Sequence, residues 1–538
     1  MRPILKNKFY LYLTEFFSGM SVMAVELGAS RLLAPYFSSS QLVWTIIIGT
    51  IMIAMALGNL YGGHQADRDP NPDRLYRRIL IAAVWIALIP VLGKYVIIGV
   101  SALLIFAVNQ NLLIWAGLCS CLLIFVFPLF LLGTVTPSLA KYCMNNLEDN
   151  ARIVGSLGAA NTVGSIIGTF VPTFVTIPAV GTNLTFLIFA GVLLALAAVY
   201  MFSGKQKPHP ALWVALLLYG LSCVLGHSTR FAFWKEDLRY EGESIYNYLQ
   251  VEETPDSVIL STNVLFGVQS IRMKDRDLTG MYYDYALAAP LMAGAEEREE
   301  PLDLFVLGMG TGTYAAQCLR YFPSAQIEGV EIDAKITELA HSCFDLPDSI
   351  PVTTYDGRAW LNAVDRRYDV IMVDAYQDIT IPFQMASVEF FTLVREHLNP
   401  GGVLVVNMNM RSGRPGNIDD YLSDTISRVF PYVYTVDVPN CTNRILFASL
   451  SPDLTDRFDR NRSLCTDLQL QLLMERVSEK LTPYRPGPYC MTDDRAPVEL
   501  LSMRMIDDLI QDELSYYKAV YRLDGLSGIL RELGLQKA

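Results

Sequence analysis

The chain has 538 residues, of which 52% are hydrophobic and 18% charged, and its formal net charge is −12. This length exceeds one ordinary domain, and the apolar composition is typical of membrane proteins. The negative charge argues against nucleic acid as a partner, because a nucleic-acid-binding protein needs a basic face to neutralise phosphates. A small cationic partner suits this charge better.

The cysteines and the N-terminus exclude two further classes. Nine cysteines are scattered along the chain without a CxxC pair or a cluster of His and Cys. We therefore expect neither a disulfide framework nor a metal site. The first apolar run is too long for a signal peptide and lacks a clean small-residue cleavage site, so we interpret it as a membrane span.

Long apolar segments fill residues 1–228, and each is near the ~20 residues that a helix needs to cross a bilayer, although the last is short. These segments cover residues 10–35, 42–62, 79–106, 112–136, 155–178, 183–203 and 210–227. The sequence thus predicts a multi-pass transmembrane domain of about seven helices over 1–228. We expect it in the plasma or inner membrane, with the lipid bilayer as a partner.

Basic residues predict the orientation of these helices, because Lys and Arg in short loops are retained on the cytoplasmic side. The basic residues that flank the spans all fall on the side of the membrane where the N-terminus lies: Arg2, Lys6, Lys8, Arg68, Arg74, Arg77, Arg78, Lys141, Arg152, Lys205 and Lys207. The N-terminus should then be cytoplasmic. Seven spans would place everything after residue 226 outside the cell, which conflicts with a cytosolic cofactor. Either the count is off by one or the second half works outside, and we expect a cytoplasmic second half.

The second half begins with a linker and a small antiparallel β domain over 229–290, indicated by alternating β-branched residues between 240 and 285. Strands and helices then alternate over 291–500. We expect strands at 303–307, 325–331, 351–354, 369–373 and 403–408, with helices near 313–322, 334–343, 358–364 and 387–397. Such alternation predicts an α/β doubly wound, Rossmann-like domain with a parallel sheet. Apolar residues at helical spacing predict an amphipathic helix within 501–538.

A glycine-rich turn follows the first of these strands. Gly308, Gly310 and Gly312 form G-x-G-x-G, where glycine permits a tight turn and close approach of the backbone to a ligand. Glu331 ends the next strand, which is the position expected for a carboxylate that binds both hydroxyls of a ribose. Together they predict a nucleoside site at the carboxyl ends of the strands.

The next two strands add acidic residues at the same kind of position. Asp356 and Gly357 follow the third strand, and the Asp side chain could accept a hydrogen bond from an adenine amino group. Asp374 ends the fourth strand. The fuller G-x-G-x-x-G of a pyrophosphate-binding loop is absent, with Tyr314 following Gly312 and Thr313, and no basic residue for a phosphate lies nearby. S-adenosylmethionine or its decarboxylated form is therefore expected rather than NAD.

These motifs carry a family resemblance. The segments "LGMGTGTYAAQCLRY", "GVEIDAKITELA", "YDGRAWL" and "YDVIMVDAYQDITIPFQMASVEFFTLVREHLNPGGVLVVN" resemble spermidine synthases (polyamine aminopropyltransferases), as do "GVQS" and "YYDYALAAP" upstream. The whole chain is similar to bacterial proteins in which such a domain is fused behind membrane helices. The resemblance implies a co-substrate and transfer site formed by Gln269, Gly308, Gly310, Thr311, Gly312, Glu331, Asp356, Gly357 and Asp374, and an amine site formed by Tyr282, Asp284 and Asp378.

The sequence also departs from the family pattern. Thr311 stands where the family usually has an Asp that helps hold the amino tail of the cofactor. Tyr283 replaces the usual His, Asp284 replaces a Glu, and Asp378 is displaced by one position from the second Asp of D-x-x-D. The specificity for the tail and for the amine therefore stays open.

The resemblance implies an aminopropyltransferase that uses decarboxylated S-adenosylmethionine, or S-adenosylmethionine, and an amine acceptor such as putrescine. Asp374 would orient the attacking nitrogen and accept its proton, while Asp284 and Asp378 would supply negative charge for the distal ammonium. An S-adenosylmethionine-dependent methyltransferase acting on a membrane-associated substrate is the nearest alternative. A second is a non-catalytic nucleoside-sensing module coupled to the membrane domain. A homodimer is a further possibility.

Overall fold

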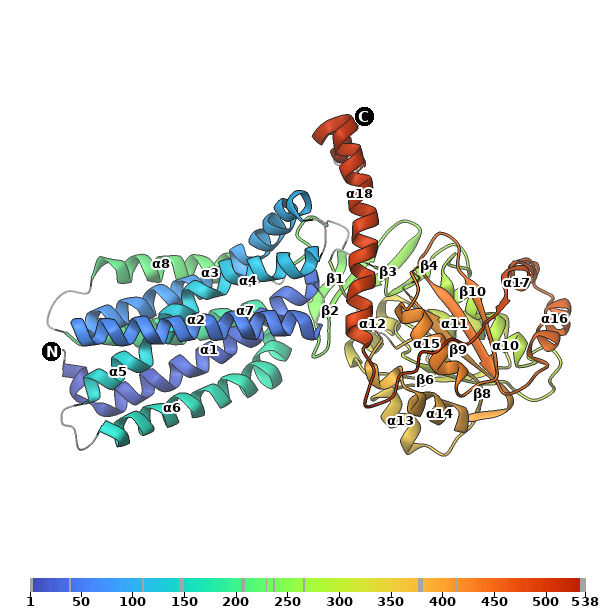
Figure 1. Cartoon of the computed structure of the whole chain (residues 1–538), viewed down its shortest axis with the longest axis horizontal. Helices are drawn as coiled ribbons and strands as arrows, with labels where there is room; N and C mark the ends of the chain where they lie inside the picture. The colour runs from blue at the N-terminus through green and yellow to red at the C-terminus, as the bar shows by residue number, and fades with distance from the viewer. Residues whose placement is uncertain are drawn as a thin grey trace. The chain divides into compact units, whose positions relative to one another are not determined.

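The structure, a computed structural model, describes residues 3–37, 40–108, 111–144, 150–204, 209–228, 230–235, 238–264, 267–375, 381–409, 411 and 414–532. The chain divides into two compact units (Figure 1). The helical unit comprises Met1–Lys235, Glu241–Tyr248 and Asn263–Leu265, and the sheet unit comprises Glu236–Tyr240, Leu249–Thr262 and Phe266–Ala538.

The helical unit consists of apolar helices joined by short connections. Its elements are η1 (Pro3–Lys6), α1 (Lys8–Phe37), α2 (Gln41–Arg68), α3 (Pro72–Ala107), α4 (Leu112–Gly133), α5 (Val135–Cys143), α6 (Asn150–Val171), η3 (Pro172–Thr176), α7 (Ile177–Phe202) and α8 (Pro210–Leu225). Within the described residues, five helical stretches are long and apolar enough to cross a membrane, and α8 is a shorter apolar helix. The longest stretch, Asn150–Phe202, includes both α6 and α7, and Gly181 interrupts it with φ 82° and ψ 170°.

Glycines let α1 and α6 approach each other closely. A Cβ atom at Gly164 would lie 2.0 Å from the carbonyl oxygen of Phe16, and one at Gly168 would lie 2.1 Å from that of Met20. Small residues at a helix crossing allow this kind of backbone contact. Because Phe16 faces Gly164 and Met20 faces Gly168, the two helices run in the same direction.

Polar contacts identify the two ends of the helical unit. At one end the Tyr200 hydroxyl donates to Asp73 over 2.7 Å, joining the end of α7 to the start of α3. At the opposite end the Tyr36 hydroxyl donates to the Phe231 carbonyl over 3.1 Å, and the Asn183 amide donates to the Ser228 carbonyl over 2.9 Å. Therefore α1, α3, α6 and α8 run from the first end to the second, and α2, α4 and α7 return (Figure 1).

One carboxylate is fully buried among these helices. Glu15 of α1 accepts hydrogen bonds at Oε1 from the Thr136 hydroxyl of α5, over 2.5 Å, and from the Asn161 amide of α6, over 2.8 Å. No described residue forms a hydrogen bond with its Oε2. Glu15 therefore joins three helices through one oxygen atom.

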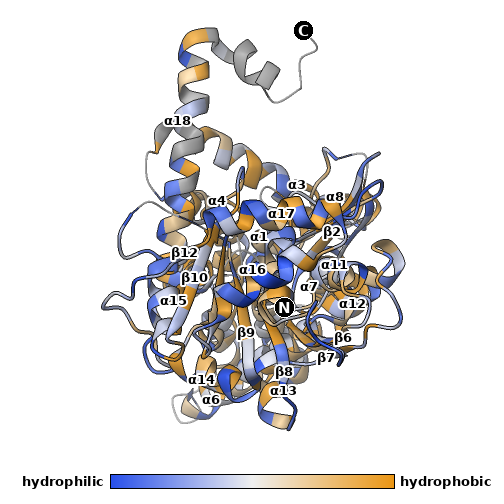
Figure 2. Ribbon diagram, turned by 90° about the vertical axis from the view of Figure 1, so that its right-hand side faces the viewer, coloured by the Kyte–Doolittle hydropathy of each residue, from blue (hydrophilic) through white to orange (hydrophobic). Residues whose placement is uncertain are grey.

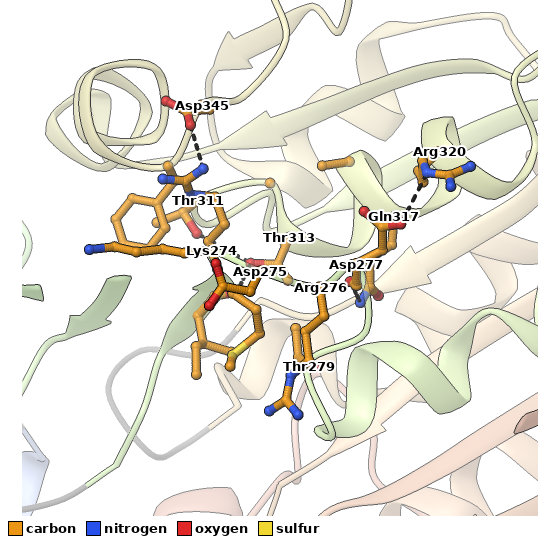
Figure 3. Close-up of a pocket in the computed structure, with 16 residues that line it drawn as sticks. Lys274, Asp275, Arg276, Asp277, Thr279, Thr311, Thr313, Gln317, Arg320 and Asp345 are labelled. Carbon is orange, nitrogen blue, oxygen red and sulfur yellow. Dashed lines mark hydrogen bonds and ion pairs between the residues drawn. The ribbon is translucent and has the colours of Figure 1, made fainter. Parts of the chain in front are cut away.

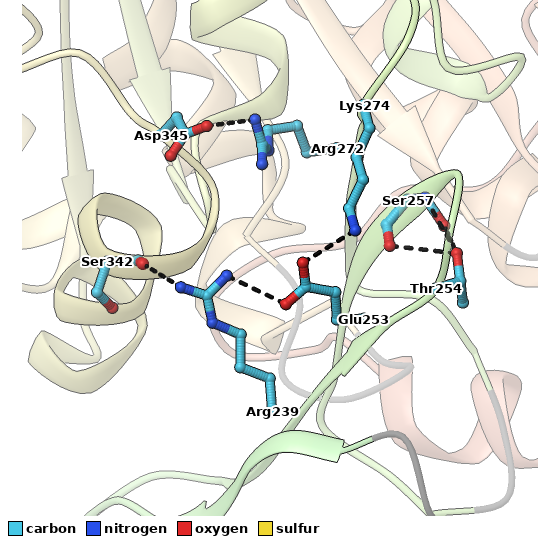
Figure 4. A network of polar contacts seen from close by, with 8 residues as sticks. All are labelled: Arg239, Glu253, Thr254, Ser257, Arg272, Lys274, Ser342 and Asp345. Carbon is cyan, nitrogen blue, oxygen red and sulfur yellow. Dashed lines mark hydrogen bonds and ion pairs between the residues drawn. The ribbon is translucent and has the colours of Figure 1, made fainter.

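A small sheet in the order β1-β2-β3-β4 precedes the main sheet, with β1 (Leu238–Glu243), β2 (Tyr248–Glu253), β3 (Ser257–Ser261) and β4 (Ser270–Met273). The strands β2, β3 and β4 pair antiparallel. Glu253 accepts from Lys274 over 2.9 Å and from Arg239 over 3.3 Å, and Arg239 also donates to the Ser342 carbonyl over 3.0 Å (Figure 4). Arg272 pairs with Asp345 in the same network. These contacts fix β4 beside α12 (Ala334–Cys343).

The main sheet has the strand order β12-β10-β11-β9-β8-β5-β6-β7. Its strands are β5 (Asp303–Leu307), β6 (Gln326–Glu331), β7 (Val352–Thr354), β8 (Tyr368–Val373), β9 (Leu398–Met408), β10 (Tyr432–Asp437), β11 (Arg444–Ser449) and β12 (Thr482–Pro483). The pairs among β7, β6, β5, β8 and β9 are parallel, whereas β11, β10 and β12 pair antiparallel. The five predicted strands thus pair in parallel as expected, and the sequence analysis did not predict the three antiparallel strands that extend the sheet. The sheet is mixed because only the short segment 438–443 connects β10 to β11, and such a connection joins antiparallel strands.

Helices cover both faces of this sheet. They are α9 (Tyr282–Ala286), α10 (Ala288–Met292), α11 (Thr313–Tyr321), α12, α13 (Gly357–Ala363), η4 (Phe383–Met385), α14 (Val388–Glu396), α15 (Ile418–Ser427), α16 (Leu454–Leu464) and α17 (Leu468–Lys480), followed by α18 (Val498–Glu532). Leu304, Val306 and Val370 belong to one buried cluster with residues of α9, α10, α11, α16 and α17. Phe305 and Ile371, which alternate with them, are also buried outside that cluster. Figure 2 shows hydrophilic residues in the loops at the rim of the view.

The α1–α6 contact predicts a large difference between two glycines of one helix. We expect Gly164→Ala to lower the melting temperature of the detergent-purified chain by several degrees, since overpacking of this kind costs about 1–3 kcal/mol. Gly155→Ala is the matched control, because nothing lies within 4 Å of the added Cβ on the same helix. Equal melting temperatures of the two variants would contradict this packing.

Candidate active site

The glycine turn, Glu331 and Asp374 meet at one edge of the main sheet. The strands β8, β5 and β6 are neighbours and run parallel, so the residues that follow their carboxyl ends lie side by side. Gly308 has φ 88°, and a Cβ atom there would lie 2.5 Å from the carbonyl oxygen of Asp374. Only glycine fits at this position, because the turn approaches the neighbouring strand directly and needs a left-handed backbone.

Glu331 is held by backbone N–H groups. Gly310 donates to Oε2 over 2.9 Å, and Asp333 donates to Oε1 over 3.0 Å. Burial raises the pKa of Glu331 to about 7, although these hydrogen bonds oppose the shift. The carboxylate therefore fixes the glycine turn, and it lies where the sequence places a ribose-binding acid.

Asp374 lies at the carboxyl end of β8 and accepts hydrogen bonds from two side chains. The Tyr282 hydroxyl donates to Oδ2 over 2.6 Å, and the Asn407 amide donates to Oδ1 over 2.9 Å. Burial raises the pKa of Asp374 to about 6, and the two hydrogen bonds oppose this shift. Compared with an ordinary aspartate, whose pKa is near ~4, Asp374 is a better proton acceptor at neutral pH.

Two asparagines extend this arrangement, and the sequence analysis did not identify either. Asn407 of β9 donates to Asp374, and Asn443 donates to the Asn407 side-chain oxygen over 2.9 Å. Asn407 and Asn443 are both buried. Asn407 could have been found from the sequence, because it is a polar residue near the end of the predicted strand at 403–408. Asn443 could not, because it precedes a strand in the antiparallel part of the sheet, which the alternation pattern did not predict.

Asp356 and Gly357 form the start of α13. The Asp356 carboxylate caps the helix by accepting from the Ala359 N–H over 2.8 Å. Gly357 is buried, and a Cβ atom there would lie 2.8 Å from Leu307 and 3.1 Å from Met385. The turn is thus packed against β5 next to the glycine turn. Its expected contact with adenine stays a prediction.

The residues expected at the amine site have different surroundings. Tyr282 contacts Asp374, as described above, and its ring lies 3.9 Å from that of Tyr283 between centroids. Asp284 is buried and accepts from the Thr279 N–H and hydroxyl, the Gly280 N–H and the Gln317 amide. These four donors give Asp284 a structural role in the turn before α9, and a role in amine binding stays a prediction. Asp378 lies outside the described residues.

Gln269 and Thr311 belong to the small-sheet side of the site. The Gln269 carbonyl accepts from the Tyr283 hydroxyl over 2.9 Å, and the buried Thr311 donates its N–H to the Ser270 hydroxyl over 3.3 Å. Thr311 and Gly312 also line a cavity of about 480 Å³ between the segment 271–279 and α11 (Figure 3). Glu331 and Asp374 do not line it. Among the described residues, no group of three or more His, Cys, Asp or Glu side chains could hold a metal ion.

Comparison with known proteins shows the family to which this chain belongs. Residues 290–456 match the family model described as "Spermine/spermidine synthase domain". The "Probable polyamine aminopropyl transferase" of Bifidobacterium longum is 51% identical over 350 residues, which cover 62% of this chain and 77% of that relative. The chain belongs to the spermidine synthase family of polyamine aminopropyltransferases. It is therefore a transferase.

Two more distant relatives match shorter stretches of this chain. The polyamine aminopropyltransferase of Vibrio vulnificus is 26% identical over 277 residues, which cover 50% of this chain and 86% of that relative. The "eEF1A lysine and N-terminal methyltransferase" of Mus musculus is 29% identical over 217 residues, which cover 38% of this chain and 30% of that relative. The chain is thus similar both to polyamine aminopropyltransferases and to a methyltransferase.

The Asn407 contact predicts a shift in the pH dependence of the transferase. Because a donated hydrogen bond stabilises the ionised carboxylate, Asn407→Ala should raise the pKa of Asp374 above about 6. The acidic limb of kcat/KM against pH should then move upward, by up to about one pH unit, which is a tenfold loss on that limb. Asn443→Ala is the control and should shift the limb less, since it acts through Asn407. An unchanged limb in Asn407→Ala would show that Asp374 does not control it.

Proposed function

We propose that the sheet unit transfers the aminopropyl group of decarboxylated S-adenosylmethionine to an amine acceptor such as putrescine. The observation that supports this most directly is Asp374, which faces the Tyr282 hydroxyl at 2.6 Å beside the glycine turn. The spermidine synthase family uses decarboxylated S-adenosylmethionine as its co-substrate. The family membership and the two hydrogen bonds to the buried Asp374 carboxylate together support this reaction class.

The proposed reaction is a single displacement. The lone pair of a neutral amine nitrogen attacks the methylene carbon next to the sulfonium, the carbon–sulfur bond breaks, and its electron pair leaves with methylthioadenosine. The nitrogen becomes positively charged and loses its proton to Asp374. An acceptor whose pKa is about 6 can take this proton and release it to solvent near neutral pH.

Each group at the site then has a defined task. Glu331 would accept hydrogen bonds from the ribose hydroxyls, and Asp356 would accept one from adenine. Gly308, Gly310 and Gly312 would allow the backbone to approach the nucleoside. Tyr282 and Asn407 would keep the Asp374 oxygens directed toward the amine, since both donate to this carboxylate. An amine acceptor also suits the net charge of −12.

Binding measurements test the proposal and separate it from methyl transfer. We expect isothermal titration of the full-length protein to show tighter binding of decarboxylated S-adenosylmethionine than of S-adenosylmethionine, with methylthioadenosine also bound. Glu331→Ala should abolish binding of all three. Asp374→Asn should keep binding and lower kcat by about 10²-fold to 10⁴-fold, the usual contribution of a general base. A preference for S-adenosylmethionine would instead support methyl transfer, and binding by Glu331→Ala would contradict the site.

We propose further that the helical unit spans a membrane. Its helices expose large apolar side chains, among them Met52, Leu60, Phe174 and Leu217, each more than 60% exposed. Water does not favour such surfaces, and lipid does. The close α1–α6 contact through glycines is also typical of helices packed in a bilayer.

The charges at the two ends of the helices indicate on which side of the membrane the sheet unit would lie. Six described basic residues, Arg68, Arg74, Arg77, Arg78, Lys141 and Arg152, belong to the end where Tyr200 contacts Asp73, whereas Arg31, Lys94 and Arg230 lie toward the other end. The chain leaves α8 at the other end, where Asn183 contacts Ser228. Since basic loops stay cytoplasmic, the sheet unit would lie on the non-cytoplasmic side. This arrangement favours the outside location over the expected cytoplasmic one, and the donor and the amine would then be supplied on that side.

A native cysteine tests this location. Cys490 of the sheet unit is exposed and free. We expect a membrane-impermeant maleimide to label it in intact cells, and Cys490→Ser should remove that labelling. Labelling of Cys490 only after lysis would place the sheet unit in the cytoplasm and overturn the proposed orientation.

A further inference from the structure

We propose that Asp493 is a positioning residue of the nucleoside site, because it clamps Arg358, the residue that follows the Asp356–Gly357 turn. Asp493 lies 37 residues beyond the end of the family match at residue 456. The inference rests on the proposed function of this site. It adds a segment near the end of the sheet unit, residues 491–495, to the parts of the chain that shape the site.

The clamp is a bidentate ion pair. Arg358 Nη1 donates to Asp493 Oδ1 over 2.7 Å, and Nη2 donates to Oδ2 over 2.6 Å. Two parallel N–H to oxygen bonds of this kind fix the direction of both side chains as well as their distance. The Arg358 side chain is 21% exposed and that of Asp493 is 41% exposed.

Arg358 connects the Asp356–Gly357 turn to η4. It is the second residue of α13, after the capping Asp356 and the buried Gly357. Its Nη1 also donates to the Gln384 carbonyl of η4 over 2.8 Å. Met385, next to Gln384, approaches Gly357, since a Cβ atom on the glycine would lie 3.1 Å from the Met385 methyl group. One guanidinium therefore sets the spacing between α13 and η4.

Asp493 is itself fixed by several contacts. Its Oδ1 accepts from the Ser387 hydroxyl over 2.5 Å, and its N–H donates to Glu389 over 3.0 Å. The neighbouring Met491 is buried, and its carbonyl accepts from the Val388 N–H over 2.9 Å. The segment 491–495 is thus docked on the start of α14, and Asp493 holds Arg358 from a rigid base.

These contacts predict an effect on nucleoside binding rather than on proton transfer. Without the clamp, the Asp356–Gly357 turn and η4 lose their shared anchor, and the site must reorganise when the nucleoside binds. Neither Arg358 nor Asp493 contacts Asp374, Tyr282 or Asn407 among the described contacts. The pH dependence of kcat should therefore stay as it is.

The test compares Asp493→Asn with Asp494→Asn in the full-length protein. Asp494 is the adjacent, exposed acid, and its side chain forms no hydrogen bond or ion pair with the described residues, so its variant controls for the loss of one negative charge. We expect Asp493→Asn to raise the KM for the sulfonium donor and the Kd for methylthioadenosine by roughly tenfold, with kcat, its pH profile and the KM for the amine changed less than twofold. Asp493→Glu should restore part of the affinity.

A double-variant cycle separates positioning from general stability. Arg358→Ala should raise the same two constants, and adding Asp493→Ala should raise them little further, because both changes break one pair. If Asp493→Asn binds methylthioadenosine as tightly as the unaltered protein, or if only its melting temperature and active fraction fall, the inference is wrong. If the unaltered protein binds no nucleoside, the proposed function fails and the inference falls with it.

Discussion

The site depends on the burial of carboxylates at the carboxyl edge of a sheet. Removing an ionised carboxylate from water costs several kcal/mol unless donors replace its hydration. At Glu331 the donors are backbone N–H groups, which requires a glycine turn whose Gly310 N–H points at the acid. At Asp374 they are a tyrosine hydroxyl and an asparagine amide from separate elements. The glycine turn, α9 and β9 are therefore all constrained by two carboxylates.

The number of donors distinguishes a reactive carboxylate from a structural one. An ionised carboxylate offers about four lone-pair positions. Asp284 receives four hydrogen bonds from Thr279, Gly280 and Gln317, so its capacity is used within the protein. Asp374 receives two from side chains, which leaves lone-pair positions for the substrate nitrogen of the proposed reaction. By the same reasoning Asp493 is a positioning residue and not a reactive one. Its oxygens accept hydrogen bonds from Arg358 and Ser387, and its proposed role is to hold the Arg358 side chain in place.

Local patterns predicted the parts of the fold that local interactions determine. The strand at 303–307 coincides with β5, and the helix at 334–343 coincides with α12, since alternation and capping are properties of adjacent residues. Gly308, Glu331 and Asp374 were identifiable because parallel strands bring their carboxyl ends together. Single strands do not reveal their partners, so the antiparallel pairing of β10 and β11 was missed.

Residues that act across long separations in sequence were not predictable from the chain alone. Asn407 contacts Asp374 only because β9 is the neighbour of β8, and Asn443 reaches Asn407 only because β11 lies on the other side of β9. Asp493 follows Arg358 by 135 residues, and no local pattern indicates that the two side chains form a pair. The Asp374–Asn407–Asn443 contacts and the Arg358–Asp493 pair both depend on tertiary contacts that the periodicity of the sequence does not reveal.

The described helices α1, α2, α3, α4, α6, α7 and α8 pass between the two ends of the helical unit an odd number of times. The proposed side of the membrane for the sheet unit depends on this number. Gly181 breaks the stretch Asn150–Phe202, so that α7 returns to the end from which α6 came. The short α8 then crosses once more, held by Tyr219, which donates to the Leu187 carbonyl of α7 over 3.1 Å, and by the Asn183–Ser228 contact at its end. Without either feature, the chain would leave the helices at the end that carries the basic residues. The proposed non-cytoplasmic location of the sheet unit thus rests on one glycine and one helix of 16 residues.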